Sequence, residues 1–334
     1  MVFQTRKLMK DNWRELSVLV AGCGSIGKRH ARVLGELGLR DVRACDPVPA
    51  QRDAMATAVP GVRLYESFEE GLRDKPDAVV IGTPPWLHIP MAVDALRAGC
   101  HVLCEKPLSD TLEGVDELER AIAETGLRFM VALCFRFHEG HHRAKALLDA
   151  GAIGRLISIR ALVGEHLPDV RPDYRDLFSS KTSGAFDLMH EVDLALWYAA
   201  SPVRRVACFS GNYSDIGIEA PDVAEVLIDF EDRRLASIHL DFFQRPRRRQ
   251  TELIGTGGVI TVEFAQWDRC ALSWHQRGQW HHDEFATDRD DMFRAEDREF
   301  LEAVASDGPV RCDLAEGRKS MEVVARARLF PSMF

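Results

Sequence analysis

Long apolar runs are missing from this chain of 334 residues. No stretch of eighteen consecutive apolar residues occurs, which argues against a membrane-spanning helix. Residues 1–16 carry charges throughout and lack the apolar core of a secretory signal. The composition, 46% hydrophobic and 28% charged, is typical of a globular protein. We therefore expect a cytoplasmic protein without a membrane partner.

Excess positive charge is missing as well, because the formal net charge is -9. This balance argues against a nucleic-acid partner. The densest basic group consists of Arg245, Arg247, Arg248 and Arg249. That group fits either a solvated strand end or a local contact with an anion, such as a substrate phosphate.

Cysteine is present at eight positions, but not in a pattern that predicts a metal site. Cys100 and Cys104 have three residues between them, and the strand expected there holds their side chains apart. We expect reduced cysteines that act as small hydrophobic residues, and no metal.

Short apolar strands alternate with helical segments in the first part of the chain. The strands are expected at 17–21, 42–45, 78–82, 101–104 and 129–133, and the helices near 26–37, 50–58, 67–73, 88–98 and 111–125. Near-continuous apolar strands joined by helices indicate a parallel sheet covered on both faces. We therefore expect an α/β protein with an N-terminal doubly wound (Rossmann) domain at 1–135.

A glycine-rich turn, Gly22-x-Gly24-x-x-Gly27, joins the first strand to the first helix. Gly22 permits a tight turn, Gly24 lets a pyrophosphate approach, and Gly27 lets the helix pack on the strand. Ser25 and Ile26 begin the helix, whose free N–H groups are expected to face the phosphates of a dinucleotide.

Asp46 follows the second strand, 24 residues after Gly22. A carboxylate here binds both hydroxyls of an adenosine ribose and repels a 2′-phosphate, so NAD is favoured over NADP. The nearby Arg43 and Arg52 keep NADP open, and a simple turn role before a proline is the alternative for Asp46.

Two loops at the ends of later strands complete the predicted cofactor site. Thr83, Pro84 and His88 lie in a proline-stiffened loop where the nicotinamide is expected, although a rigid connector and a helix cap fit these residues too. Lys106, in the run Glu105-Lys106-Pro107, follows the strand at 101–104. A lysine there points into the ligand crevice of such a sheet.

Longer, often alternating strands dominate residues 136–334, which we expect to form a C-terminal α+β domain. They are predicted at 156–163, 203–209, 224–230, 235–243, 251–254, 259–264 and 270–274, with helices at 136–150, 291–306 and 314–328. This pattern predicts a large, open, mainly antiparallel sheet with one exposed or partner-covered face.

One helix, at 183–197, interrupts the strands. Asp187, His190 and Asp193 are spaced by three and are expected along one side of it. His190 is either a buried histidine satisfied by Asp187 or a positioned proton acceptor.

Together these stretches resemble the glucose–fructose oxidoreductase / inositol dehydrogenase / MocA (Gfo/Idh/MocA) family. The resemblance rests on VLVAGCGSIGKRHA, on PDAVVIGTPPWLHIPMAVDALRAGCHVLCEKPL, on CFRFH, on GAIGRL and on SGAFDLMHEVDLALW. It implies a two-domain enzyme that moves hydride between NAD(P) and a carbon of a sugar, a sugar derivative, nucleotide-linked or free, or a cyclitol.

The resemblance also implies roles for individual residues. Lys106 contacts the reacting hydroxyl and the cofactor, Glu105 is a second cofactor contact, and His190 is the proton acceptor or donor, with Asp187 or Asp193 orienting its ring. Further candidates for substrate contact are Arg136, His138, Glu165, His166, Arg171, Tyr174 and Arg175. Assembly into a homodimer or homotetramer through the C-terminal sheet is expected.

Two departures from the family pattern affect the substrate site. Residue 186 is Phe where many members have aspartate, which gives a DLxHExD helix typical of a subgroup, and Cys134-Phe135 replaces a more usual aromatic–Asn pair. An NAD-dependent glycosidase that works by transient oxidation and elimination, and a non-catalytic NAD-binding regulator, are the alternative functions.

Overall fold

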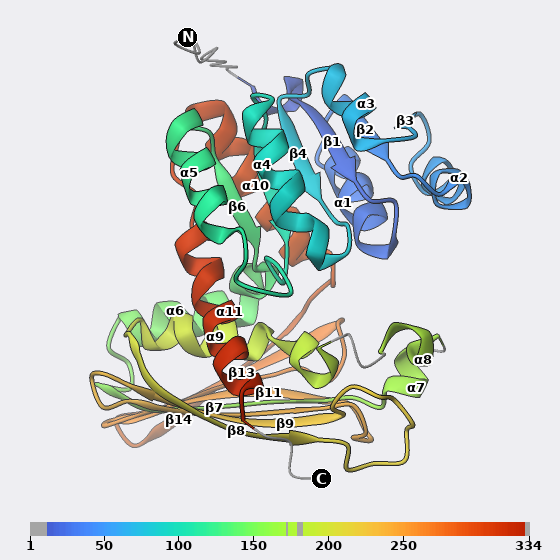
Figure 1. Ribbon diagram of the computed structural model, residues 1–334. Coiled ribbons are helices and arrows are strands. Elements are labelled where there is room, and N and C mark those ends of the chain that lie inside the picture. Colours follow the sequence, from blue (N-terminus) through green and yellow to red (C-terminus); the bar gives the residue numbers. More distant parts are fainter. Residues whose placement is uncertain (1–11, 172, 179–182, 331–334) are drawn as a thin grey trace. The chain divides into compact units, whose positions relative to one another are not determined.

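The computed structural model describes residues 12–330, apart from residue 172 and residues 179–182. The chain forms two compact units. One runs to Cys134 and also includes Phe293–Met321, and the other comprises Phe135–Met292 and continues from Glu322. We call them the six-stranded unit and the eight-stranded unit after their sheets (Figure 1).

The six-stranded unit is a doubly wound sheet with the strand order β3-β2-β1-β4-β5-β6, and every pairing in it is parallel. Its strands are β1 Ser17–Ala21, β2 Asp41–Cys45, β3 Arg63–Tyr65, β4 Ala78–Ile81, β5 His101–Glu105 and β6 Phe129–Ala132. Apart from β3, these strands are almost entirely buried. The order reverses between β1 and β4, which is where such sheets bind ligands.

Helices connect these strands and pack on the sheet. They are α1 Ser25–Glu36, α2 Pro49–Ala58, α3 Phe68–Arg73, the 3-10 turn η2 Pro85–Leu87, α4 His88–Arg97 and α5 Val115–Thr125, preceded by η1 Trp13–Glu15. The two last helices of the chain are α10 Asp291–Ser306 and α11 Leu314–Arg328, and most of α10 groups with this unit. The sequence predicts a single domain boundary between residues 135 and 136. In the structure, Phe293–Met321 also belongs to the six-stranded unit, because it packs there.

The eight-stranded unit is an open sheet with the order β14-β13-β12-β11-β7-β10-β9-β8. Its strands are β7 Leu156–Gly164, β8 Val203–Gly211, β9 Val223–Phe230, β10 Leu235–Asp241, β11 Arg248–Gly255, β12 Gly258–Glu263, β13 Arg269–Gln276 and β14 Gln279–Ala286. Among the described strands only β7 and β10 pair in parallel. The expected α/β fold with a Rossmann sheet and a second, mainly antiparallel sheet is confirmed.

Helices cover one face of this second sheet, where α6 and α9 contact its strands (Figure 1). The helical elements are η3 Cys134–Phe137, α6 Glu139–Asp149, α7 Leu167–Val170, α8 Tyr174–Leu177, η4 Gly184–Leu188 and α9 His190–Ala199. Phe209, Leu227 and Leu235 lie on neighbouring strands and expose between 45% and 57% of their surfaces. This exposure matches the partner-covered or open face that the alternating pattern predicts.

The prediction of one continuous helix at 183–197 is wrong. Residues Gly184–Leu188 form a 3-10 turn, and the α-helix begins only at His190. Gly184 adopts a positive φ of 57°, and a Cβ there would lie 2.3 Å from the carbonyl oxygen of Pro221. A side chain at position 184 would clash with Pro221, whose carbonyl oxygen accepts the Ala185 N–H at 2.8 Å. The 3-10 turn puts Asp187 on a different element from His190 and Asp193.

Within the described residues no helix is both long and apolar enough to span a bilayer.

Candidate active site in two parts

The glycine turn has the geometry that its sequence predicts. Gly22 has a φ of +94°, and a Cβ there would lie 2.7 Å from the carbonyl oxygen of Gly82. A Cβ on Gly27 would lie 1.8 Å from the carbonyl oxygen of Gly22, so only glycine fits. At Gly24, by contrast, a Cβ would meet no protein atom within 4 Å. Gly24 precedes α1, and the space beside its backbone suits a pyrophosphate at a helix N-terminus.

Asp46 follows β2 and is fixed by two backbone donors. Its Oδ2 accepts a hydrogen bond from the N–H of Cys23 at 2.9 Å, and its Oδ1 accepts one from Val48 at 2.9 Å. The carboxylate is thereby fixed beside the glycine turn. Burial raises the pKa of the Cys23 thiol to about 11, so this cysteine stays neutral in the turn.

The two arginines that keep NADP open are both engaged elsewhere. Arg43 donates from Nε to Asp41 and from Nη1 to the carbonyl oxygen of Asp74. Arg52 donates to the backbone carbonyl of Asp46 at 2.7 Å, and its Nη2 lies 3.2 Å from Glu66. Both guanidinium groups are therefore engaged by protein groups and offer no ready phosphate site.

His88 links the two loops at the carboxyl ends of β4 and β5. Its Nδ1 lies 2.8 Å from the carbonyl oxygen of Pro107, and its Nε2 lies 2.7 Å from that of Thr83. The ring is 1% exposed, and burial lowers its pKa. Both ring nitrogens thus contact the protein backbone, which favours a loop-fastening role over direct cofactor contact. Pro84 caps the short turn η2 between these loops.

Lys106 directly follows β5, at the carboxyl edge of the parallel sheet. Glu105 Oε2 accepts a hydrogen bond from the Lys106 N–H at 3.0 Å, and Glu105 Oε1 lies 3.0 Å from His30 Nε2. Glu105, predicted as a cofactor contact, is therefore engaged by protein groups at both carboxylate oxygens. It is 6% exposed and holds the backbone of Lys106.

In the eight-stranded unit, His190 is the first residue of α9 and is 9% exposed. Its ring centroid lies 4.2 Å from that of Phe135, on η3. The guanidinium of Arg249, from β11, lies 4.4 Å from the centroid of the same Phe135 ring. A cation on the face of an aromatic ring is attracted to it. His190 is therefore held beside an aromatic ring that also carries a buried arginine.

The two acids that follow His190 in the DLxHExD stretch are both paired with arginines. Asp193 accepts from Arg136 Nη2 at 2.7 Å and from Arg136 Nε at 3.0 Å, and both side chains are buried. Glu191 Oε1 lies 2.7 Å from Arg249 Nε. Burial raises the pKa of Glu191, and Arg249 opposes that rise. Arg136 is the partner of Asp193, and its contact with substrate stays a prediction.

Buried neutral imidazoles surround the same aromatic group. His138 caps α6 by accepting from the Gly140 N–H at 3.2 Å, and it stacks on Phe264 at 4.4 Å. Burial, with help from the charge of Arg249, lowers the pKa of His138 to about 4. His141 is similarly buried, and burial lowers its pKa well below the usual value. These two histidines are therefore packing and capping groups rather than titrating bases.

The remaining candidates for substrate contact lie on and around α7 and α8. Tyr174 donates from its hydroxyl to the carbonyl oxygen of Ile216 at 2.9 Å, and Arg175 Nε donates to that hydroxyl. His166 Nδ1 lies 3.1 Å from Asp169. Glu165 is 3.1 Å from Arg247, while Arg171 is exposed. The dense arginine group is likewise locally paired, because Arg245 binds Asp169.

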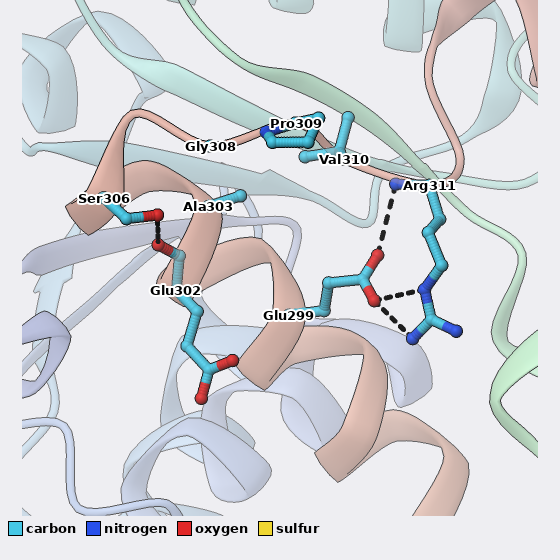
Figure 2. A pocket seen from close by; sticks show the side chains of 8 residues that line it. All are labelled: Glu299, Glu302, Ala303, Ser306, Gly308, Pro309, Val310 and Arg311. Carbon is cyan, nitrogen blue, oxygen red and sulfur yellow. Dashed lines mark hydrogen bonds and ion pairs between the residues drawn. The ribbon is translucent and has the colours of Figure 1, made fainter.

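A separate hollow of about 320 Å³ lies at the end of α10 (Figure 2). Glu299 and Arg311 from its lining form an ion pair with each other, and the Arg311 N–H donates to Glu299 at 3.2 Å. It contains none of the predicted site residues. In the described part of the chain, no group of three or more His, Cys, Asp and Glu side chains is arranged to hold a metal ion.

Sequence reasoning missed three groups that the structure brings to the candidate residues: His30, Glu191 and Arg249. His30 lies in the quoted GKRHA stretch and Glu191 adjoins His190, so both stood next to recognised motifs. Their partners are distant in sequence, however, and no local spacing identifies them.

Comparisons with known proteins agree with this arrangement. Residues 16–133 match the family described as "Oxidoreductase family, NAD-binding Rossmann fold", and residues 141–261 match the "GFO/IDH/MocA C-terminal domain". The six-stranded unit is thus an NAD-binding Rossmann domain.

Individual relatives extend the comparison. An inositol 2-dehydrogenase of Leifsonia xyli subsp. xyli is 34% identical over 197 residues, which are 58% of this chain and 56% of that protein. A 2,7-anhydro-N-acetylneuraminate hydratase of Mediterraneibacter gnavus is 25% identical over 73% of this chain and 66% of that protein. The aligned part therefore spans little more than half of the first relative and about two thirds of the second.

The fold is shared with a scyllo-inositol dehydrogenase from Lactobacillus casei, solved with NAD(H) and scyllo-inositol. That structure has a TM-score of 0.81 and 21% identity over 94% of this chain and 95% of its own. With both family domains matched in order, the chain belongs to the Gfo/Idh/MocA family of oxidoreductases.

Proposed function

We propose that this protein transfers hydride between NAD and a hydroxyl-bearing carbon of a sugar, a sugar derivative or a cyclitol. The observation that carries this proposal is the position of Lys106. It follows β5 at the carboxyl edge of the NAD-binding sheet, with its backbone held by Glu105. The glycine turn leaves β1 at the same edge, so a dinucleotide bound there would extend toward this lysine.

Bound NAD would supply the acceptor for the hydride that leaves the reacting carbon. In this proposal His190 takes the hydroxyl proton while a hydride leaves the same carbon for the nicotinamide. The products are a carbonyl, a proton on His190 and a reduced nicotinamide. The Lys106 ammonium donates a hydrogen bond to the reacting oxygen and stabilises the charge that develops on it. In the reverse direction His190 returns the proton.

Asp187 is retained as a group that orients His190 or binds a substrate hydroxyl. The break between η4 and α9 means that this role depends on the turn, not on a shared helix face. His166 and Tyr174 remain proposed substrate contacts from the α7–α8 region. Thr83, Pro84, Ser25 and Ile26 are proposed cofactor contacts through their backbone positions.

NAD is the proposed physiological cofactor, in preference to NADP. Asp46 places a fixed carboxylate beside the glycine turn, and the two neighbouring arginines are engaged with protein groups. A 2′-phosphate would meet negative charge there without a prepared cation.

Assembly through the open face of the eight-stranded sheet is also proposed. The exposed Phe209, Leu227 and Leu235 would be covered by a second copy in a homodimer or homotetramer. Light scattering coupled to gel filtration tests this, and a monomer at micromolar concentration would contradict it.

The function is tested by a substrate screen with the purified full chain. Free and nucleotide-linked sugars and cyclitols, inositols included, are offered with NAD and with NADP while the absorbance of reduced nicotinamide is followed. We expect turnover with at least one polyol and a preference for NAD. NAD binding without turnover on any of these compounds, in either direction, would instead support a non-catalytic regulator.

The hydratase relative supports a second candidate, a reaction without net redox change. A transient oxidation that makes an adjacent C–H bond acidic would permit elimination of water or of a glycosidic partner, after which reduction restores the NAD. Such an enzyme would convert its substrate with no accumulation of reduced nicotinamide. Product analysis by mass spectrometry alongside the absorbance assay separates the two candidates.

A further inference from the structure

Three side chains from distant parts of the sequence meet inside the six-stranded unit. His30 from α1 has its Nδ1 2.9 Å from Asp297 Oδ1, on α10, and its Nε2 3.0 Å from Glu105 Oε1, at the end of β5. His30 and Asp297 are completely buried, and Glu105 is nearly so. The imidazole therefore bridges two carboxylates out of contact with water.

This network ends on the backbone of Lys106. The carboxylate oxygen of Glu105 that does not face His30 accepts the Lys106 N–H at 3.0 Å. Because a carboxylate is planar, fixing one oxygen on His30 also fixes the direction from which the other oxygen meets Lys106. We propose that His30 is a positioning residue that sets the place of Lys106 through Glu105, while Asp297 holds the His30 ring. This inference rests on the proposed function, since it gives Lys106 its geometry.

The charges of His30 and Glu105 support an ionised bridge between these two side chains. Burial opposes a charge on His30, but Asp297 and Glu105 together raise its pKa well above the usual value. Burial likewise disfavours the ionised Glu105, yet its bond with His30 leaves the pKa of Glu105 below the usual value. An imidazolium between carboxylates makes hydrogen bonds about twice as strong as neutral ones. Such a bridge resists rotation of the Glu105 side chain.

Helix α10 supplies Asp297 and two further contacts to the helix that carries His30. The helix is encoded after the whole eight-stranded sheet, yet most of it belongs to the six-stranded unit (Figure 1). Beside Asp297, its Arg294 lies 3.1 Å from Glu36 at the end of α1, and Phe293 meets the edge of the His30 ring. The contacts from α10 thus fall on the helix that carries His30, and the bridge transmits them to Lys106.

The test compares His30→Leu and His30→Gln with the matched control His101→Leu. His101 begins the same strand β5, at the end away from Lys106, and its Nδ1 accepts the Arg128 N–H at 2.9 Å. Its replacement removes a partly buried imidazole without touching the network. Each variant is assayed for kcat, for the dissociation constant of NADH by fluorescence, and for thermal midpoint.

A second readout does not depend on turnover. The rate at which an amine-reactive reagent labels Lys106, followed by peptide mass spectrometry, reports the surroundings of that lysine in every variant. If the wild type labels differently from His30→Leu yet turns over no substrate, the positioning claim stands and the proposed function fails.

We expect His30→Leu to lower kcat about tenfold to a hundredfold, because misplacing a reacting group by about 1 Å has that effect. The NADH dissociation constant should stay within about twofold of the wild type. His30→Gln, whose amide still donates to Glu105, should recover part of kcat, and Lys106 labelling should change at least about threefold in His30→Leu alone. Unchanged kcat and labelling in a folded His30→Leu protein would overturn the inference, as would equal losses in His101→Leu.

Discussion

Two buried histidines, His30 in the six-stranded unit and His138 in the eight-stranded unit, have neighbours of opposite charge. In the six-stranded unit, His30 lies between two carboxylates that raise its pKa well above the usual value. In the eight-stranded unit, His138 lies near Arg249, and burial together with that charge lowers its pKa to about 4. The neighbours thus favour the cationic form of the imidazole at His30 and the neutral form at His138. Neighbours, not residue type, decide which histidines can take part in proton transfer.

The acids differ in the same way. Asp193 and Glu191 in the eight-stranded unit each have a buried arginine partner. Near His30, the fully buried Glu296 is surrounded by other acids, and burial, helped by Glu105 and Asp297, raises its pKa well above the usual value. Burial and the neighbouring acids therefore favour the neutral form of Glu296, whereas Asp193 is ion-paired with Arg136. The substitutions and the pH change described next test this contrast.

The largest effect is expected from removing the candidate catalytic group of the six-stranded unit. Lys106→Met should lower kcat by about a thousandfold or more, because the ammonium that stabilises the reacting oxygen is lost. NADH binding should change by less than about threefold, since the glycine turn and Asp46 are untouched. Lys145→Met, which removes a surface lysine paired with Asp149, is the control. Turnover at the wild-type level in Lys106→Met would remove the lysine from the mechanism.

The candidate catalytic group of the eight-stranded unit gives the next largest effect. His190→Asn should lower kcat by about a hundredfold to a thousandfold, the usual contribution of a positioned acid or base. The fall in rate toward acid pH, which arises because a protonated imidazole cannot accept a proton, should flatten in this variant. His281→Asn, an exposed histidine stacked on Trp274, should keep the wild-type profile. An acid limb that persists in His190→Asn would point to another base.

The contrast between paired and protonated acids is tested by two amide substitutions. Asp193→Asn should cost about 3 kcal/mol or more of stability, because it leaves the charge of the buried Arg136 without its carboxylate. Glu296→Gln should cost less than about 1 kcal/mol, because a neutral carboxylic acid is replaced by a neutral amide of the same shape. Denaturant unfolding monitored by circular dichroism measures both. Equal losses would show that the two acids do not differ in charge.

Acid pH offers a test of His138 alone. Its pKa is about 4 in the folded chain and about 6.5 when unfolded. Because the unfolded state binds the proton first, the full stability is present above about pH 6.5 and declines as the pH falls toward 4. The decline attributable to this residue is about 2–3 kcal/mol. His138→Asn, which preserves an N-cap, should lack this part of the loss. Parallel pH curves for the two proteins would contradict the assignment.

The smallest effect concerns cofactor choice. Asp46→Asn should raise the KM for NAD about tenfold or less and narrow the preference over NADP, because one ribose contact loses its charge and the repulsion of a 2′-phosphate falls. Asp53→Asn, on the outer part of α2, serves as the control. An unchanged NAD to NADP ratio of kcat/KM would show that Asp46 has only the turn role.

Local patterns in the sequence predicted most of the six-stranded unit. Its five predicted strands and the glycine turn lie within a residue of their expected bounds, because continuous apolar runs and sterically required glycines are direct signals of structure. Two strands were missed, β3 and β14. Arg63–Tyr65 is short and half exposed, and Gln279–Ala286 is an exposed edge strand with charged and histidine side chains. Neither has the apolar pattern on which strand prediction depends.

The sequence predicts only those residues of the candidate site that stand within a short motif. Lys106, Asp46 and His190 each stand within a recognisable run, but the groups that hold them do not. His30 and Asp297 are 267 residues apart, and Arg249 is 58 residues from Glu191. Such pairs are set by packing of distant segments, and a single sequence contains no spacing that reveals them. The 3-10 turn at Gly184–Leu188, where Pro221 approaches Gly184 from a distant segment, is a further case, and it contradicts the expected continuous helix at 183–197.

The central proposal is that Lys106 and His190 act on the same hydroxyl. The direct measurement is kcat/KM of the double variant Lys106→Met, His190→Asn beside the two single variants. Groups that act as a unit show strongly non-additive losses. We predict that the double variant is no more than about threefold slower than the slower single variant. Losses that multiply in full would show that the two side chains act independently and would contradict the account.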